Sequence, residues 1–127
     1  MLSSDTKIQI PEYNHFIYPD AVVVCEKIEL YPGNPKAIVN PLLIVEVLSP
    51  SAQAYDREGK FLRYKTLPSF KEYVLVRQDK PAVNAIFREK PTVWLDTFAE
   101  GLDSLISLKS IGCELSLENI YKGVNFQ

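Results

Sequence analysis

The stretch LLIVEVLSPS, residues Leu42 to Ser51, places one carboxylate inside a run of aliphatic side chains. Its length, its β-branched content and the prolines at positions 41 and 50 predict a strand that is covered on both faces. Side chains alternate along a strand, so Glu46 shares a face with Ile44 and Leu48. A carboxylate buried among aliphatic groups must be paired, protonated or bound to a cation. Glu46 is therefore the first candidate for a functional group.

The composition is that of an ordinary globular protein, with 46% hydrophobic and 24% charged residues among 127. We expect a single domain over residues 1–127. The N-terminus lacks a signal peptide and the longest apolar run is too short to cross a bilayer, so we expect a cytoplasmic protein.

Two cysteines and one histidine argue against a structural zinc site. The net charge of −2 gives no general attraction to DNA, which would need a local basic patch. The candidates for that patch are Arg57, Lys60, Arg63 and Lys65.

The pattern along the chain predicts an α+β fold built on a mixed β-sheet. We expect strands over residues 5–11, 18–25, 42–48 and 72–79, and loops over 12–16 and 30–41. The spacing of Phe61, Tyr64 and Leu67 predicts a helix over residues 55–67, which ends before Pro68. Two further strands form a hairpin with Lys90 and Pro91 near its turn, and residues 117–121 close on the core.

A second acid, Asp20, opens the strand over residues 18–25 and shares a face with Val22 and Val24. One loop rich in proline and glycine separates this strand from that of Glu46, which favours antiparallel neighbours. Two acids facing the same side repel each other unless a cation lies between them. Mg²⁺ binds one or two carboxylates together with backbone carbonyls and waters, and the carbonyl of Val47 is the natural third protein ligand. The alternative for Asp20 is a turn cap after Pro19.

Lys60 lies at the edge of the apolar stripe of the predicted helix, so its ammonium can reach the acids. A lysine there can assist an attacking water or stabilise the negative charge of a phosphorane-like transition state. The alternative is an ion pair with Asp56, one helical turn away. For Glu46 the alternative is a structural ion pair with Arg57 or Lys60.

The segments YPDAVVVC, LLIVEVLSPS and YDREGKFLRYKTLPSFKEYVLV resemble the Uma-type family of restriction-endonuclease-like proteins, long known as a domain of unknown function. That family is similar to the PD-(D/E)XK nucleases. The resemblance runs from about Ser3 to Tyr121. The combination of VEVLSPS with YDREGKFLRY is its most specific part.

The resemblance implies a restriction-endonuclease-like fold and a metal-dependent hydrolase that cleaves DNA, with Mg²⁺ as cofactor and Mn²⁺ as its substitute. Asp20 and Glu46 correspond to the two acids of the nuclease motif. Leu48 stands where the motif has its lysine, so the resemblance assigns that role to Lys60 on the following helix. The family also has an N-terminal extension with a helix before the first strand, and we expect this chain to lack it. The alternative is an inactive scaffold that serves as a dimerising or binding module. A homodimer suits either function.

Overall fold

The computed structural model describes residue 2 and residues 6–13, 15–24, 27–49 and 55–124. Side chains at positions 15, 34–36 and 55–57 lie outside this description. The elements in chain order are β1 (Lys7–Ile10), η1 (Pro11–Tyr13), β2 (His15–Ile17), β3 (Ala21–Val23), β4 (Leu30–Tyr31), β5 (Asn34–Ile38), β6 (Leu43–Leu48), η2 (Tyr55–Lys60), α1 (Phe61–Tyr64), β7 (Glu72–Arg77), β8 (Ala82–Lys90), β9 (Val93–Glu100), β10 (Leu105–Leu108), η3 (Lys109–Ile111), β11 (Cys113–Ser116) and α2 (Leu117–Ile120).

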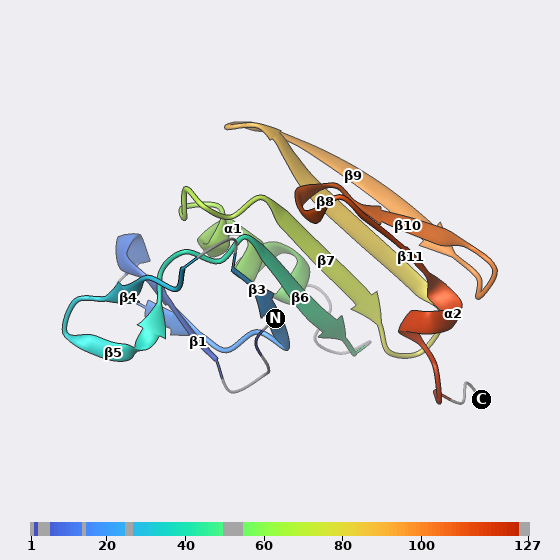
Figure 1. The fold of residues 1–127 in the computed structure, drawn as a ribbon, viewed down its shortest axis with the longest axis horizontal. Helices are drawn as coiled ribbons and strands as arrows, with labels where there is room; N and C mark the ends of the chain where they lie inside the picture. Colours follow the sequence, from blue (N-terminus) through green and yellow to red (C-terminus); the bar gives the residue numbers. More distant parts are fainter. Residues whose placement is uncertain (1, 3–5, 14, 25–26, 50–54, 125–127) are drawn as a thin grey trace.

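A five-stranded sheet in the order β3-β6-β7-β8-β9 forms the centre of the molecule (Figure 1). Strands β6 and β7 are parallel, and the other neighbouring strands of this sheet are antiparallel. Parallel neighbours need a crossover connection, which η2 and α1 provide. The predicted mixed sheet and the antiparallel pairing of the two acid-bearing strands are confirmed.

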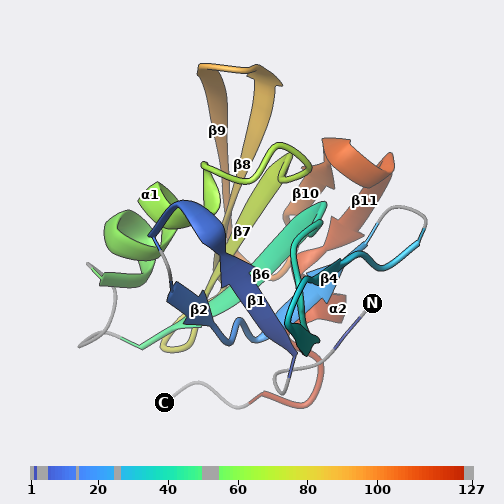
Figure 2. The same cartoon turned by 90° about the vertical axis from the view of Figure 1, so that its left-hand side faces the viewer.

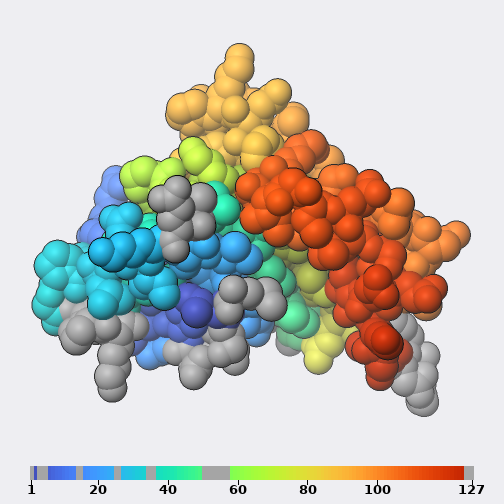
Figure 3. Space-filling view, in the orientation of Figure 1, coloured from blue at the N-terminus to red at the C-terminus, as the bar shows by residue number. Residues whose placement is uncertain are grey.

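The two faces of this sheet are covered by different parts of the chain. A four-stranded sheet, in the order β2-β1-β5-β4, shares one core with α1 and one face of the central sheet. The β10–β11 pair and α2 pack on the other face, over Leu43, Val74 and Val83. Figure 2 shows β1 and β2 in front of β6, and Figure 3 shows the N-terminal and C-terminal segments on opposite sides of the molecule. Glu46 therefore lies on the face that α1 covers.

The second sheet corrects the sequence prediction, which assigned residues 12–16 and 30–41 to loops. Strand β2 and the β4–β5 hairpin come from these segments. Pro32 and Gly33 form the hairpin turn, in which Gly33 has a φ of 85°. Proline followed by a glycine with positive φ is typical of a type II turn. Pro32 therefore marks a turn, and Pro35 falls within β5, which lies between β1 and β4, so this segment is not a plain connection.

The helix is also shorter than predicted, with a π-helical turn over Tyr55–Lys60 and a single α-helical turn over Phe61–Tyr64. The β8–β9 hairpin is confirmed, and so is the closure of α2 on the core. The expectation that β6 is covered on both faces is wrong at its end, because Val47 is 44% exposed. Among the described residues, no helix combines the length and apolar character needed to cross a membrane.

Candidate active site

Glu46 is held in the core with its charge compensated. Its side chain lies in β6 between Ile44 and Leu48, and the residue is 1% exposed. Lys60 Nζ lies 3.4 Å from Glu46 Oε2, and the Tyr64 hydroxyl donates a hydrogen bond of 3.0 Å to the same oxygen. A buried charge needs a counter-charge and hydrogen bonds, and these two side chains supply both.

The turn between η2 and α1 brings Lys60 and Tyr64 to the carboxylate. Residues four apart on a helix share a face, so both side chains point toward β6. Phe61 fixes the position of the turn, because its ring stacks on that of Tyr73 in β7 with the centroids 5.2 Å apart. Tyr64 is completely buried, whereas the Lys60 side chain is 16% exposed. Lys60 therefore connects the buried acid with the surface.

Asp20 is fixed on the edge of β6 beside Glu46. Its backbone N–H donates to the Val45 carbonyl at 3.1 Å, and its Oδ2 accepts the Val47 N–H at 2.7 Å. The β3–β6 register ends with Ala21 opposite Val45, and Asp20 precedes this pair at a bend, so its two hydrogen bonds place it beside Val45 and Val47, on either side of Glu46 in the sequence. The carboxylate thus accepts a hydrogen bond from the neighbouring strand. A turn cap would instead bond to a backbone N–H of its own turn. Asp20 is exposed, unlike Glu46.

Strand geometry places the carbonyl of Val47 on the side of β6 that faces β3. Successive carbonyls of a strand point to opposite sides, and that of Leu48 accepts the Gln78 N–H next to β7. The carbonyl of Val47 therefore faces the β3 side, as its N–H does in bonding Asp20. Two carboxylates and one backbone carbonyl are in this way brought to one end of β6.

These groups fit a hard divalent cation. Mg²⁺ prefers oxygen ligands and keeps several waters, so two carboxylates and a carbonyl are sufficient protein ligands. Within the described ranges, no group of three or more His, Cys, Asp or Glu side chains gathers in a metal-binding arrangement. The fit therefore depends on the Val47 carbonyl and on water.

The residues that the sequence predicted for the site make two contacts on β6: Asp20 with the Val47 N–H, and Lys60 with Glu46. The alternative pairs with Asp56 and Arg57 concern side chains outside the described residues. Tyr64 is the residue that the sequence analysis missed, since it was assigned only to the apolar stripe. Its position four residues after Lys60 was the available signal, because the two side chains must share a helical face.

A second buried carboxylate, Glu72 in β7, lies on the opposite face of the sheet and is 0% exposed. It accepts hydrogen bonds from the backbone N–H groups of Lys109 and Ser110 and from the Ser110 hydroxyl. These three donors account for a structural role, in which Glu72 holds η3 against the sheet. Glu72 therefore gives a natural comparison for Glu46.

Comparisons with known proteins agree with this architecture. The chain is 37% identical over 127 residues to uncharacterized protein slr1290 of Synechocystis sp., and 40% identical over 75 residues to uncharacterized protein sll1609 of the same organism. It covers 64% and 42% of the lengths of these two relatives. A solved structure, titled as a putative nuclease belonging to DUF820 from Anabaena variabilis, superposes with a TM-score of 0.69 at 16% identity. That superposition covers 95% of this chain and 66% of the other, and it shows a shared fold.

A family profile matches most of the chain. The profile of the Uma2 family, described as "Putative restriction endonuclease", matches residues 1–118. The chain belongs to the Uma2 family, with the restriction-endonuclease-like fold that its strands and crossover helix form.

Proposed function

We propose that this protein is a Mg²⁺-dependent endonuclease that hydrolyses phosphodiester bonds of DNA. The observation that carries the proposal is the convergence of Lys60, Glu46 and Asp20 at one end of β6 in a chain of this family. A buried acid shared by a lysine and a tyrosine, beside an exposed acid, is the type of cluster that active sites use.

Asp20, Glu46 and the Val47 carbonyl would hold the cation. Mg²⁺ would supply Lewis-acid stabilisation of the charge that develops on a phosphoryl oxygen. Mn²⁺ would take the same ligands.

The protein groups have separate roles in the hydrolysis. Water attacks the phosphorus and releases a proton to solvent, the bond from phosphorus to the leaving oxygen breaks, and that oxygen takes up a proton from solvent. Negative charge builds on the phosphoryl oxygens in the transition state. The Lys60 ammonium, held at the carboxylate of Glu46, would orient the attacking water and stabilise that charge. Tyr64 would position Glu46 through its hydrogen bond, so that the carboxylate keeps one orientation.

A second candidate is a nuclease-like scaffold without catalysis. Lys60 and Tyr64 already satisfy the buried oxygen of Glu46, so this cluster has a structural account that needs no cation. Such a scaffold would act as a dimerising or binding module. Either function is compatible with a homodimer, because cleavage of both DNA strands requires two sites.

Nicking of supercoiled plasmid in Mg²⁺ or Mn²⁺ distinguishes the two candidates. Wild type is compared with Glu46→Gln, and with Glu58→Gln as a control because Glu58 is an exposed acid of η2. Metal-dependent nicking that is lost only in Glu46→Gln supports the endonuclease. Absence of nicking by wild type favours the scaffold.

A further inference from the structure

A pair of exposed aromatic side chains leads directly to Asp20. Along residues 16–20, exposed and buried positions alternate: Phe16, Tyr18 and Asp20 are exposed, and Ile17 and Pro19 are buried. Phe16 is 45% and Tyr18 50% exposed. In an extended segment, alternate side chains lie on one side, about 7 Å apart. The two rings therefore lie on one side of the chain, and Asp20 of the candidate active site follows Tyr18 by two residues, at the bend before β3.

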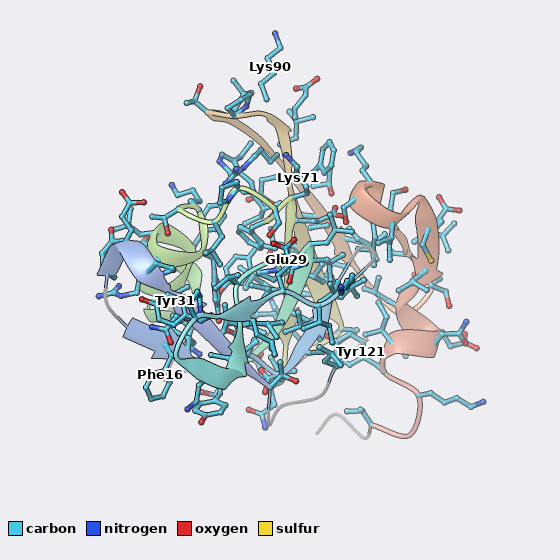
Figure 4. The ribbon with its side chains drawn as sticks, turned by 60° about the vertical axis from the view of Figure 1, so that its left-hand side comes forward. Phe16, Glu29, Tyr31, Lys71, Lys90 and Tyr121 are labelled. Atoms are coloured by element: carbon cyan, nitrogen blue, oxygen red, sulfur yellow. The ribbon has the colours of Figure 1, made fainter. Side chains whose placement is uncertain are left out.

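Lys7 adds a cation to these rings from the neighbouring strand. Its Nζ lies 4.3 Å from the ring centroid of Phe16 and 5.9 Å from that of Tyr18. The two rings meet edge to face with their centroids 5.9 Å apart. Figure 4 shows Phe16 projecting outward from the N-terminal sheet. We call Lys7, Phe16 and Tyr18 the aromatic surface.

We propose that the aromatic surface binds unstacked bases of a single-stranded nucleic acid and guides the adjoining phosphate to Asp20 and Glu46. This inference rests on the proposed function and narrows its substrate to DNA with unpaired bases, which includes the segments that open transiently in a supercoiled plasmid. Bases of an intact duplex are stacked on one another, so their faces are not open to protein rings. Aromatic rings at regular spacing beside a cation are the arrangement with which proteins bind single strands irrespective of sequence.

The charge of the protein indicates that phosphate contacts contribute little to binding at the aromatic surface. The net charge of −2 gives the chain no general attraction for a phosphate backbone. Within the aromatic surface, Lys7 is the basic residue, and each phosphate neutralised on a single strand adds about −0.7 to the salt slope. Binding that depends on the rings should therefore respond only weakly to salt.

Fluorescence anisotropy tests the inference in a form separate from cleavage. The probe is a labelled 12-nucleotide single strand, or the same strand in a duplex, in EDTA with the Glu46→Gln protein. Phe16→Leu and Tyr18→Leu are introduced into that background. The control is Phe98→Leu, because Phe98 on β9 is 56% exposed and lies away from the aromatic surface, on the strand at the opposite edge of the central sheet.

We expect tighter binding of the single strand than of the duplex. Loss of one stacking ring should weaken single-strand binding about tenfold, as stacked bases contribute about 1–3 kcal/mol each. Phe98→Leu should bind like its parent. Equal affinity for the duplex, or unchanged affinity after both aromatic substitutions, would overturn the inference.

The outcome is independent of the nicking experiment. If wild type nicks plasmid but Phe16→Leu and Tyr18→Leu bind the single strand as tightly as their parent, the endonuclease proposal is retained and the role of the aromatic surface is rejected. Ring-dependent binding of single strands without nicking would support the aromatic surface, and would assign it to the scaffold rather than to an enzyme.

Discussion

The Tyr64 hydroxyl donates a 3.0 Å hydrogen bond to Glu46, and both residues are buried. Glu46 thus has a fixed partner on α1, independent of any cation. This bond helps to explain how a strand of aliphatic residues tolerates a carboxylate. It also means that the position of α1 sets the orientation of the Glu46 carboxylate.

Tyr64→Phe removes this hydrogen bond while keeping the ring in the core. Lys60 still pairs with Glu46, so we expect the free energy of unfolding to fall by only about 1 kcal/mol. If Tyr64 positions Glu46 for the cation, the affinity for Mn²⁺ should fall as well. Urea unfolding and Mn²⁺ titration calorimetry measure the two effects. A variant that loses stability but binds Mn²⁺ like wild type would limit Tyr64 to a structural role.

Lys60→Met separates metal binding from chemistry. Removing the ammonium takes away a cation that competes for Glu46, so Mn²⁺ affinity should be unchanged or higher. Nicking should fall at least about 100-fold, because the positive charge next to the developing phosphoryl charge is lost. The control is Lys65→Met, since Lys65 lies over the ring of Phe61 instead of reaching the acid. Full nicking activity in Lys60→Met would refute the assignment of Lys60.

Much of the site followed from the sequence because its signals are local. Glu46 is a lone acid in an aliphatic strand. Asp20 opens a strand that one short connection joins to the strand of Glu46, and helical spacing places Lys60 at the edge of the apolar stripe. The missed features depend on contacts between distant residues. The partners of Glu72 are 37 and 38 residues away, and nothing in the local pattern identifies them. The β4–β5 part of the N-terminal sheet was missed because proline and glycine are typical of loops, whereas here Pro32 lies in a hairpin turn and Pro35 within β5.

Loss of charge should destabilise the protein more at Glu72 than at Glu46. Glu72→Gln presents an amide N–H₂ to groups that are themselves donors, so it should lower the free energy of unfolding by about 2–3 kcal/mol. Glu46→Gln keeps a carbonyl oxygen for Tyr64, and Lys60 can turn its ammonium toward water. Glu46→Gln should therefore lower the free energy of unfolding by only about 1 kcal/mol.

Thermal unfolding with and without Mn²⁺ completes this comparison. A cation at 100 times its Kd stabilises the folded protein by about 2.7 kcal/mol, which corresponds to about 8 °C in a domain of this size. We expect that shift in wild type and Glu72→Gln, and its absence in Glu46→Gln. A Glu46→Gln protein that is strongly destabilised but keeps the full Mn²⁺ shift of its unfolding temperature would make Glu46 a structural ion-pair partner.

Tyr121 gives the fold a dependence on alkaline pH. Its hydroxyl oxygen lies 2.7 Å from the carbonyl oxygen of Arg77 and 3.1 Å from that of Ala82, so it ties the residue after α2 to the β7–β8 connection. Burial raises the pKa of Tyr121 above its usual value of 10.0. A raised pKa means that the folded state holds the phenol proton more tightly than the unfolded chain does. The stabilisation is therefore complete below about pH 10 and is lost as the pH rises through the pKa of the folded protein.

Tyr121→Phe tests this account by removing the titrating group together with its hydrogen bonds. At pH 7 the variant should be less stable than wild type by about 1–2 kcal/mol, because the carbonyls of Arg77 and Ala82 lose a donor. Above pH 10 wild type loses a stabilisation that the variant never had, so the gap between them should narrow. Urea unfolding at pH 7, 9 and 10.5 measures that gap. A gap that stays constant over this range would show that Tyr121 does not couple its ionisation to folding.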